Sequence, residues 1–165
     1  MRKIYIVFLL FLAVLPLKAQ YVGGFGVNVN STGTVYPIDS IHSGDLIYEL
    51  SLRFFESSNR SYDIMFGKGK DFYNFTVMKE VHNVLFYPVD WYIGLGLHGG
   101  LWSKNHWNDG LDHTNKTFFG VDGMAGLQFT FAPIAISVGV KPYYNFYGGD
   151  QFFWMKQVSL RLVFY

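Results

Sequence analysis

Apolar and polar residues alternate along most of this chain, and that alternation restricts the fold more than any other feature. Because successive side chains of a strand point to opposite faces, each alternating stretch predicts a β-strand with one apolar and one polar face. The predicted strands are residues 21–30, 46–55, 61–67, 72–83, 91–102, 118–131, 134–146 and 154–165. Helical periodicity is nearly absent after residue 20. Eight short strands separated by turn residues predict an all-β, antiparallel, up-and-down barrel.

The face that points outward distinguishes two kinds of barrel. In a soluble secreted barrel the apolar face lines a cavity for a small apolar ligand, and this remains an alternative. Here the polar face carries many Gly, Ala and Ser residues, which suit the narrow interior of an eight-stranded barrel. Aromatic residues lie near strand ends on the apolar face, as in the girdles of membrane barrels: Phe54, Trp91, Phe131, Tyr144, Trp154 and Phe164. We therefore predict a transmembrane barrel whose apolar face contacts lipid.

The N-terminus has the pattern of a secretory signal peptide. Arg2 and Lys3 precede an apolar run over residues 4–17, and Ala19 offers a small residue for cleavage. The run is shorter than the roughly 17–25 residues of a membrane-spanning helix. We predict a signal peptide over residues 1–19 and a single barrel domain over residues 20–165.

Composition excludes several classes of function. The chain has no Cys, which excludes disulfides, thiolate metal sites, a Cys nucleophile and a lipid anchor on Cys. Its net charge of +1 provides no basic face for nucleic acid. Only 15% of residues are charged, against about 25% in ordinary soluble domains.

Connection lengths predict the orientation of the barrel. Residues 31–45 and 103–117 are long polar connections, whereas residues 56–60 and the pair Ala132-Pro133 are short. Outer-membrane barrels have short turns on the periplasmic rim and long loops outside. Since the long loops follow odd-numbered strands, both termini are predicted to be periplasmic.

The end of the chain carries a family resemblance. The last eight residues, VSLRLVFY, place Val158, Leu160, Leu162 and Phe164 at alternate positions. This ending resembles the C-terminal signature of outer-membrane barrels of Gram-negative bacteria, although Tyr165 follows the phase-matched aromatic. The stretches DWYIGLGLHGGLW, GVDGMAGLQFTF and ISVGVKPYYNF also resemble a widespread group of small eight-stranded outer-membrane barrel proteins. The resemblance implies this fold and an integral bacterial outer-membrane location, but no activity.

Charged residues on the polar face should meet inside the barrel. They are Glu49, Arg53, Asp63, Glu80, His82, His98, Asp122, Lys141 and Arg161. Charges withdrawn from water must be paired, so we expect a network of four carboxylates and three cations that fills the lumen. A catalytic or proton-binding cluster is the alternative. A pore is not expected, because channels need wider barrels.

An enzyme remains the main alternative function. Lipid A deacylases and palmitoyltransferases resemble this chain in size, and a deacylase requires Ser and His within hydrogen-bond reach. His98 with Ser137 and Asp122 is one conceivable set across neighbouring strands. No motif of either enzyme family can be carried over to this sequence residue by residue.

The loop over residues 103–116 is a second place where function could reside. Trp102, His106 and Trp107 form a candidate extracellular contact surface, although Trp residues here also suit an aromatic belt at the outer leaflet. The loop has His and Asp residues but no known metal-binding spacing, so we expect no metal and no cofactor. We predict a non-catalytic barrel that contacts outer-membrane lipids and either stabilises the membrane as a structural protein or serves as an accessory subunit of a larger outer-membrane protein complex.

Overall fold

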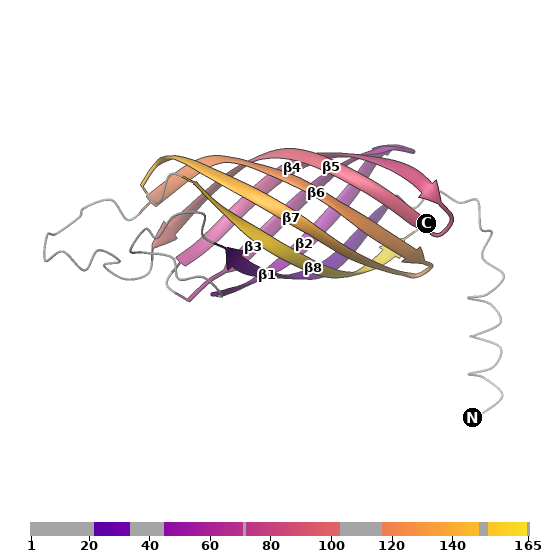
Figure 1. Cartoon of the computed structure of the whole chain (residues 1–165), viewed down its shortest axis with the longest axis horizontal. Coiled ribbons are helices and arrows are strands. Elements are labelled where there is room, and N and C mark those ends of the chain that lie inside the picture. The colour runs from indigo at the N-terminus through magenta and orange to yellow at the C-terminus, as the bar shows by residue number, and fades with distance from the viewer. Residues whose placement is uncertain (1–21, 34–44, 71, 103–116, 149–151, 165) are drawn as a thin grey trace, which may run out of the picture.

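The protein forms a closed barrel of eight antiparallel strands (Figure 1). The structure, a computed structural model, describes residues 22–33, 45–70, 72–102, 117–148 and 152–164. The strands are β1 (Gly23–Gly33), β2 (Leu46–Ser57), β3 (Arg60–Lys68), β4 (Phe72–Phe86), β5 (Val89–Trp102), β6 (Thr117–Phe131), β7 (Ile134–Tyr147) and β8 (Phe152–Phe164). Each strand pairs with the next, and β8 pairs with β1. The predicted fold class is therefore confirmed. In the described part of the chain, no helix is long and apolar enough to cross a membrane.

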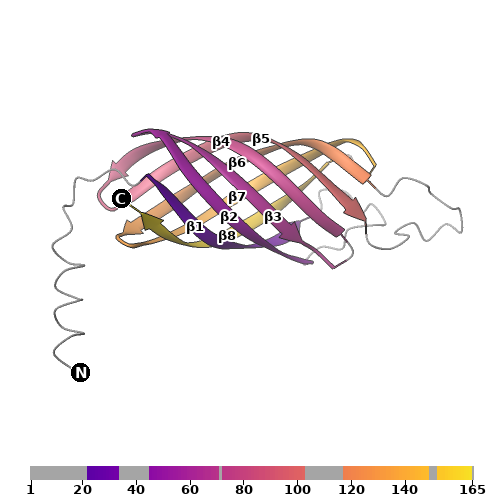
Figure 2. The ribbon, with the colours of Figure 1, turned by 180° about the vertical axis from the view of Figure 1, so that it is seen from behind.

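The strands run obliquely around the barrel and are longer than predicted at several ends (Figure 2). The predicted long connection at residue 31 begins only after Gly33, because Ser31, Thr32 and Gly33 pair with β8. The fourth and fifth strands also extend toward each other, leaving only Tyr87 and Pro88 between them. Pairing with a neighbouring strand stabilises these ends as strand, which composition alone does not indicate. The predicted signal peptide lies outside the described residues.

The two faces of the sheet are inverted relative to a soluble barrel. On β8, Val158 and Leu162 are 56% and 51% exposed, whereas Ser159 and Arg161 between them are each 2% exposed. The same contrast occurs on β2, where Leu50 points outward and Glu49 is buried. An apolar exterior around a polar, filled interior suits lipid and is the opposite of a barrel with an apolar ligand cavity.

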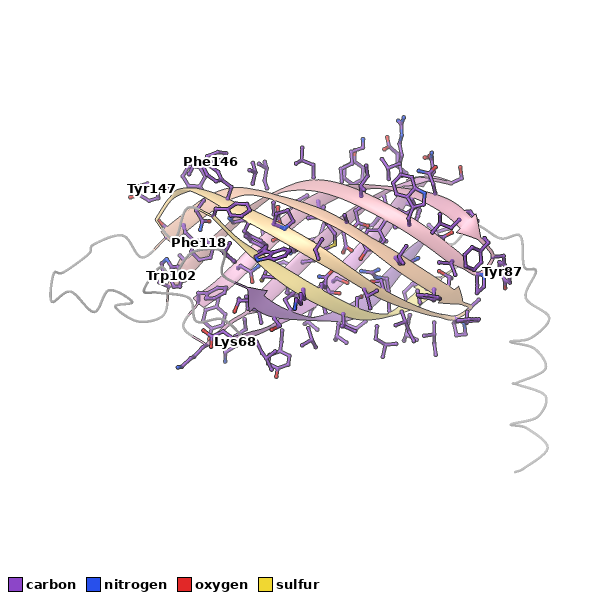
Figure 3. The ribbon with its side chains drawn as sticks, viewed as in Figure 1. Lys68, Tyr87, Trp102, Phe118, Phe146 and Tyr147 are labelled. Carbon is purple, nitrogen blue, oxygen red and sulfur yellow. The ribbon has the colours of Figure 1, made fainter. Side chains whose placement is uncertain are left out.

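Exposed aromatic residues gather at both ends of the barrel, as Figure 3 shows for Phe146 and Tyr147 at one end and Tyr87 at the other. At the end with the long connections they are Tyr48, Tyr73, Phe119, Tyr144, Phe146, Tyr147, Phe152 and Trp154. At the short-turn end they are Phe54, Tyr62, Phe86, Tyr87, Phe131 and Phe164. Two such girdles separated by an apolar band are the pattern expected at the two interfaces of a bilayer.

Small residues on the inner face leave room for large ones opposite. An ideal Cβ at Gly94 would lie 2.8 Å from Met78 Sδ and 3.0 Å from Glu80 Cγ. The space beside β5 is thus already occupied by side chains from β4. Gly94 therefore allows a charged side chain and a methionine to fill a narrow lumen.

Candidate functional site in the barrel lumen

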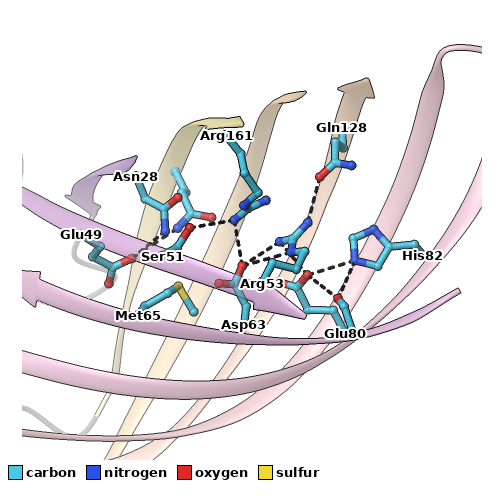
Figure 4. Close-up of polar contacts among 12 residues, drawn as sticks. Asn28, Glu49, Ser51, Arg53, Asp63, Met65, Glu80, His82, Gln128 and Arg161 are labelled. Carbon is cyan, nitrogen blue, oxygen red and sulfur yellow. Dashed lines mark hydrogen bonds and ion pairs between the residues drawn. The ribbon is translucent and has the colours of Figure 1, made fainter. Parts of the chain in front are cut away.

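The short-turn half of the lumen holds a compact group of four charges, here called the arginine cluster: Arg53, Asp63, Glu80 and Arg161. Arg53 Nη2 lies 2.8 Å from Asp63 Oδ2 and 2.7 Å from Glu80 Oε2. Arg161 Nη2 lies 2.8 Å from the same Asp63 oxygen (Figure 4). All four side chains are at most 2% exposed. Two cations face two carboxylates, so the cluster neutralises itself.

The register of the strands places this cluster. Arg53 of β2 lies directly opposite Asp63 of β3, while Glu80 comes from β4 and Arg161 from β8. Two neutral groups complete the shell, because Arg53 Nη1 donates to Gln128 Oε1 at 2.8 Å and Arg161 Nη2 donates to Ser51 Oγ at 3.0 Å. Burying charge is costly unless partners and hydrogen bonds are supplied, and here they come from five strands.

A second group, the lysine cluster, consists of Glu49, His98, Asp122 and Lys141. Lys141 Nζ lies 3.2 Å from Glu49 Oε1 and 3.7 Å from Asp122 Oδ2. His98 Nδ1 lies 3.9 Å from Asp122 Oδ1, and its Nε2 is 2.7 Å from Asn145 Oδ1. Glu49 also accepts hydrogen bonds from the side-chain amides of Asn28, Asn74 and Gln157. This cluster is as deeply buried as the first.

Asp122 is where the charges of the two clusters do not balance. Among the described residues, the two clusters contain four carboxylates and three Lys or Arg cations, and the arginine cluster is already neutral. Glu49 has Lys141 and three amides, whereas neither oxygen of Asp122 accepts a hydrogen bond from a described residue. Lys141 Nζ at 3.7 Å and His98 Nδ1 at 3.9 Å are the nitrogen atoms that face the Asp122 carboxylate.

Methionine and aromatic side chains fill the space around the two clusters. Met65 is the next inward residue after Asp63 on β3, and its Sδ lies 3.7 Å from Lys141 Nζ. It packs with Met78, Tyr92 and Met124 in one buried cluster. Met is unbranched and flexible, so it fills irregular gaps between fixed polar groups.

Aromatic rings close the lumen at the long-connection end. Trp102 packs 5.3 Å from Phe72 and 5.1 Å from Phe118, measured between ring centroids, and its Nε1 donates to the Gly148 carbonyl at 2.7 Å. Below them Tyr143 stacks on Phe153 at 5.0 Å. The described side chains leave about 10 Å³ here, roughly the space of one water molecule. The described part of the lumen is therefore packed and closed at this end.

Trp102 does not belong to an aromatic belt that contacts lipid. Its parity on β5 is that of Tyr92 and His98, so its ring lies at the mouth of the lumen and not on the lipid-facing wall (Figure 3). His106 and Trp107, the other two residues of the predicted contact surface, lie outside the described residues. Among the residues that are described, no group of three or more His, Asp and Glu side chains could hold a metal ion.

The predicted set of His98, Ser137 and Asp122 is only partly brought together. His98 contacts Asn145 of β7, and Ser137 lies eight residues from Asn145 on the same strand. At about 3.3 Å per residue this is a separation of roughly 26 Å. Ser137 therefore cannot act as a nucleophile activated by His98.

Sequence analysis missed another Ser, His and carboxylate group near the short-turn end. Ser61 Oγ lies 3.1 Å from His82 Nε2, and the same nitrogen lies 3.0 Å from Glu80 Oε2. A catalytic relay needs the two ring nitrogens to serve different partners, one for the nucleophile and one for the carboxylate. Here one nitrogen serves both, and Ser61 is fully buried. The group therefore has the geometry of a packed polar network.

Solved structures share this barrel. The N-terminal β-barrel domain of Pseudomonas aeruginosa OprF matches with a TM-score of 0.61 and 13% identity, over 86% of this chain and 97% of that one. Neisserial surface protein A matches with 0.59 and 12%, over 88% and 98%. The outer membrane enzyme PagL matches with 0.53 and 12%, over 84% and 98%.

At these identities the likeness concerns the fold alone. The chain has the fold of the small eight-stranded outer-membrane barrels, and the resemblance inferred from the sequence is confirmed at that level. No known protein family and no curated protein matches the sequence.

Proposed function

We propose that this protein is a non-catalytic, integral outer-membrane barrel that acts as a structural or accessory subunit. The observation that carries the proposal is the arginine cluster, whose four charged groups bind one another across the lumen. Ion pairs between side chains of β2, β3, β4 and β8 hold these strands together across the lumen. Such a core supports a scaffold whose exterior and loops make the functional contacts.

In the proposed orientation the short turns and both termini lie in the periplasm. Because the chain has no Cys, single cysteines can report on this orientation. We expect a membrane-impermeant maleimide to label Lys70→Cys, in the connection between β3 and β4, on intact cells. Asn59→Cys, in the turn between β2 and β3, should be labelled only after the outer membrane is permeabilised. The reverse pattern would overturn the orientation.

The accessory role is tested by purification from native outer membranes. The affinity tag is placed in a loop, and the C-terminus is left untagged. We expect the protein, purified in mild detergent, to retain a protein partner at a fixed ratio, measured by mass spectrometry. Replacing residues 104–115 with a Gly-Ser linker should release that partner while leaving the barrel folded, because the eight strands close the barrel by pairing with one another. Recovery of the barrel with lipid alone in both forms would contradict the accessory role.

Analysis of lipid A distinguishes the non-catalytic proposal from a lipid-modifying enzyme. The likeness to PagL shows that this fold can support an enzyme, so the lipid A of cells with and without the protein should be compared by mass spectrometry. We expect identical lipid A masses. A mass shift on expression would replace the non-catalytic proposal with a lipid-modifying activity.

A further inference from the structure

The outer wall of the barrel carries a groove over strands β1 to β4. It encloses about 590 Å³ and is lined mainly by Val27, Val29, Tyr48, Leu50, Phe66 and Tyr73. Val27 and Val29 come from β1, and the aromatic rings of Tyr48, Phe66 and Tyr73 come from β2, β3 and β4. A mainly apolar groove on a lipid-facing surface suits a hydrocarbon chain.

Lys68 lies at the rim end of this groove, where Figure 3 shows it pointing away from the barrel wall. Its Nζ is 5.6 Å from the centroid of the Tyr73 ring. On the other side of the groove, Lys156 of β8 pairs in the sheet with Ser31 of β1 and is exposed on the outer wall. Three strand spacings across the sheet and two residues along it separate the two lysines, or about 16 Å along the wall.

Neither lysine has a carboxylate partner among the described residues. This differs from Lys79, near the short-turn end of the same wall, whose Nζ lies 3.3 Å from Glu56 Oε2. A cation on a lipid-facing surface needs an anion nearby, and a long Lys side chain can extend along the wall to the interface to reach one. Since no described carboxylate pairs with Lys68 or Lys156, the anionic groups of a lipid are suitable partners for both.

We propose that this groove binds a bisphosphorylated glycolipid of the outer leaflet, with one acyl chain over Val27 and Val29 and the phosphates at Lys68 and Lys156. The proposal rests on the orientation given above, which places the Lys68 end at the cell surface. Two cations on separate strands fit a headgroup with two phosphates better than one with a single phosphate. Lys ammonium groups are common phosphate ligands and bind as point charges.

The test measures lipid binding to the delipidated full-length barrel in detergent by native mass spectrometry, with bisphosphorylated lipid A as the probe. Wild type should bind one molecule, and the double variant Lys68→Gln, Lys156→Gln should bind about tenfold more weakly, since each charge-assisted contact contributes severalfold. The matched control is Lys79→Gln, which removes a cation from the same wall at the opposite end and should bind like wild type.

A second variant tests the groove itself without changing charge. Val29→Phe places a larger side chain in the groove and should weaken binding of lipid A while leaving the lysines in place. Equal binding by wild type and the double variant, or equal binding of lipid A and its dephosphorylated form, would overturn the proposal. Equal affinity for phosphatidylglycerol would also overturn it, because simple attraction of anionic lipid would then be sufficient.

The two experiments distinguish an error in the proposed orientation from an error in the proposed lipid site. Binding in detergent does not depend on which rim faces outward, whereas maleimide labelling does. Loss of specific binding with the expected labelling removes the glycolipid site and leaves the orientation. Reversed labelling removes the outer-leaflet glycolipid as the occupant, whatever the affinity measured in detergent.

Discussion

Replacement of Arg53 by Met should lower the free energy of unfolding by about 3–5 kcal/mol, the usual effect of removing one partner from a buried ion pair. Arg53 contacts Asp63, Glu80 and Gln128 and lies over the Tyr92 ring. Met keeps most of the length of the side chain, so the loss should be electrostatic. Of the arginine cluster, Arg161 would then be the one remaining cation for Asp63 and Glu80, with His82 Nε2 still 3.0 Å from Glu80 Oε2. Equilibrium unfolding in urea, in lipid vesicles, measures the difference.

A charge-restoring variant separates electrostatics from packing. Adding Glu80→Gln to Arg53→Met leaves Arg161 facing Asp63, a balanced pair, so the double variant should recover part of the lost stability. Lys79→Met is the matched control, because it breaks the exposed pair with Glu56 on the outer wall and should leave stability nearly unchanged. If the double variant were as unstable as Arg53→Met, the charge balance of the arginine cluster would not be what stabilises the barrel.

The strands and their faces could be predicted because period-2 alternation records which side chains meet lipid. On β8, the alternation of Val158, Leu160 and Leu162 with Ser159 and Arg161 is enough to predict the exposed and buried faces. Strand ends were less predictable. Polar residues such as Ser31 and Thr32 resemble a loop in the sequence and are strand in the structure, because β8 pairs with them.

The partners inside the lumen could not be predicted, because they depend on register. Alternation places Arg53 and Asp63 on the inner face, but only the pairing of β2 with β3 sets them opposite each other. A shift of two residues would keep every face and change every ion pair. For the same reason, the sequence does not show that Ser137 and His98, two members of a conceivable catalytic set, lie far apart along the barrel. Gln128, a neutral partner of Arg53, is not predicted, because an uncharged amide on the inner face does not by itself indicate a place in an ion-pair network.

The second prediction with a large expected effect concerns the contact between the apolar wall of the barrel and the membrane. Val158 lies at the middle of β8, pairs with Val29 and Val138, and is 56% exposed. At the midplane of a bilayer, Arg on the outer face of a barrel costs about 2–4 kcal/mol, and near an interface it costs about 0–1 kcal/mol. We therefore expect Val158→Arg to destabilise the barrel in vesicles strongly and Leu46→Arg, at the long-connection rim, to have little effect.

A comparison of the two variants in water and in a bilayer distinguishes the cost of placing a charge in lipid from a loss of packing. In water both positions would be exposed sites, where Arg is tolerated and the two variants should unfold alike. In a bilayer only Val158→Arg places a charge in hydrocarbon, so the difference between the variants measures the depth of each position and not the loss of a valine contact. Equal stability of the two variants in vesicles would mean that the apolar wall does not contact lipid at the level of Val158. A large difference would place the girdles at the two interfaces, with Lys68 and its groove at one of them.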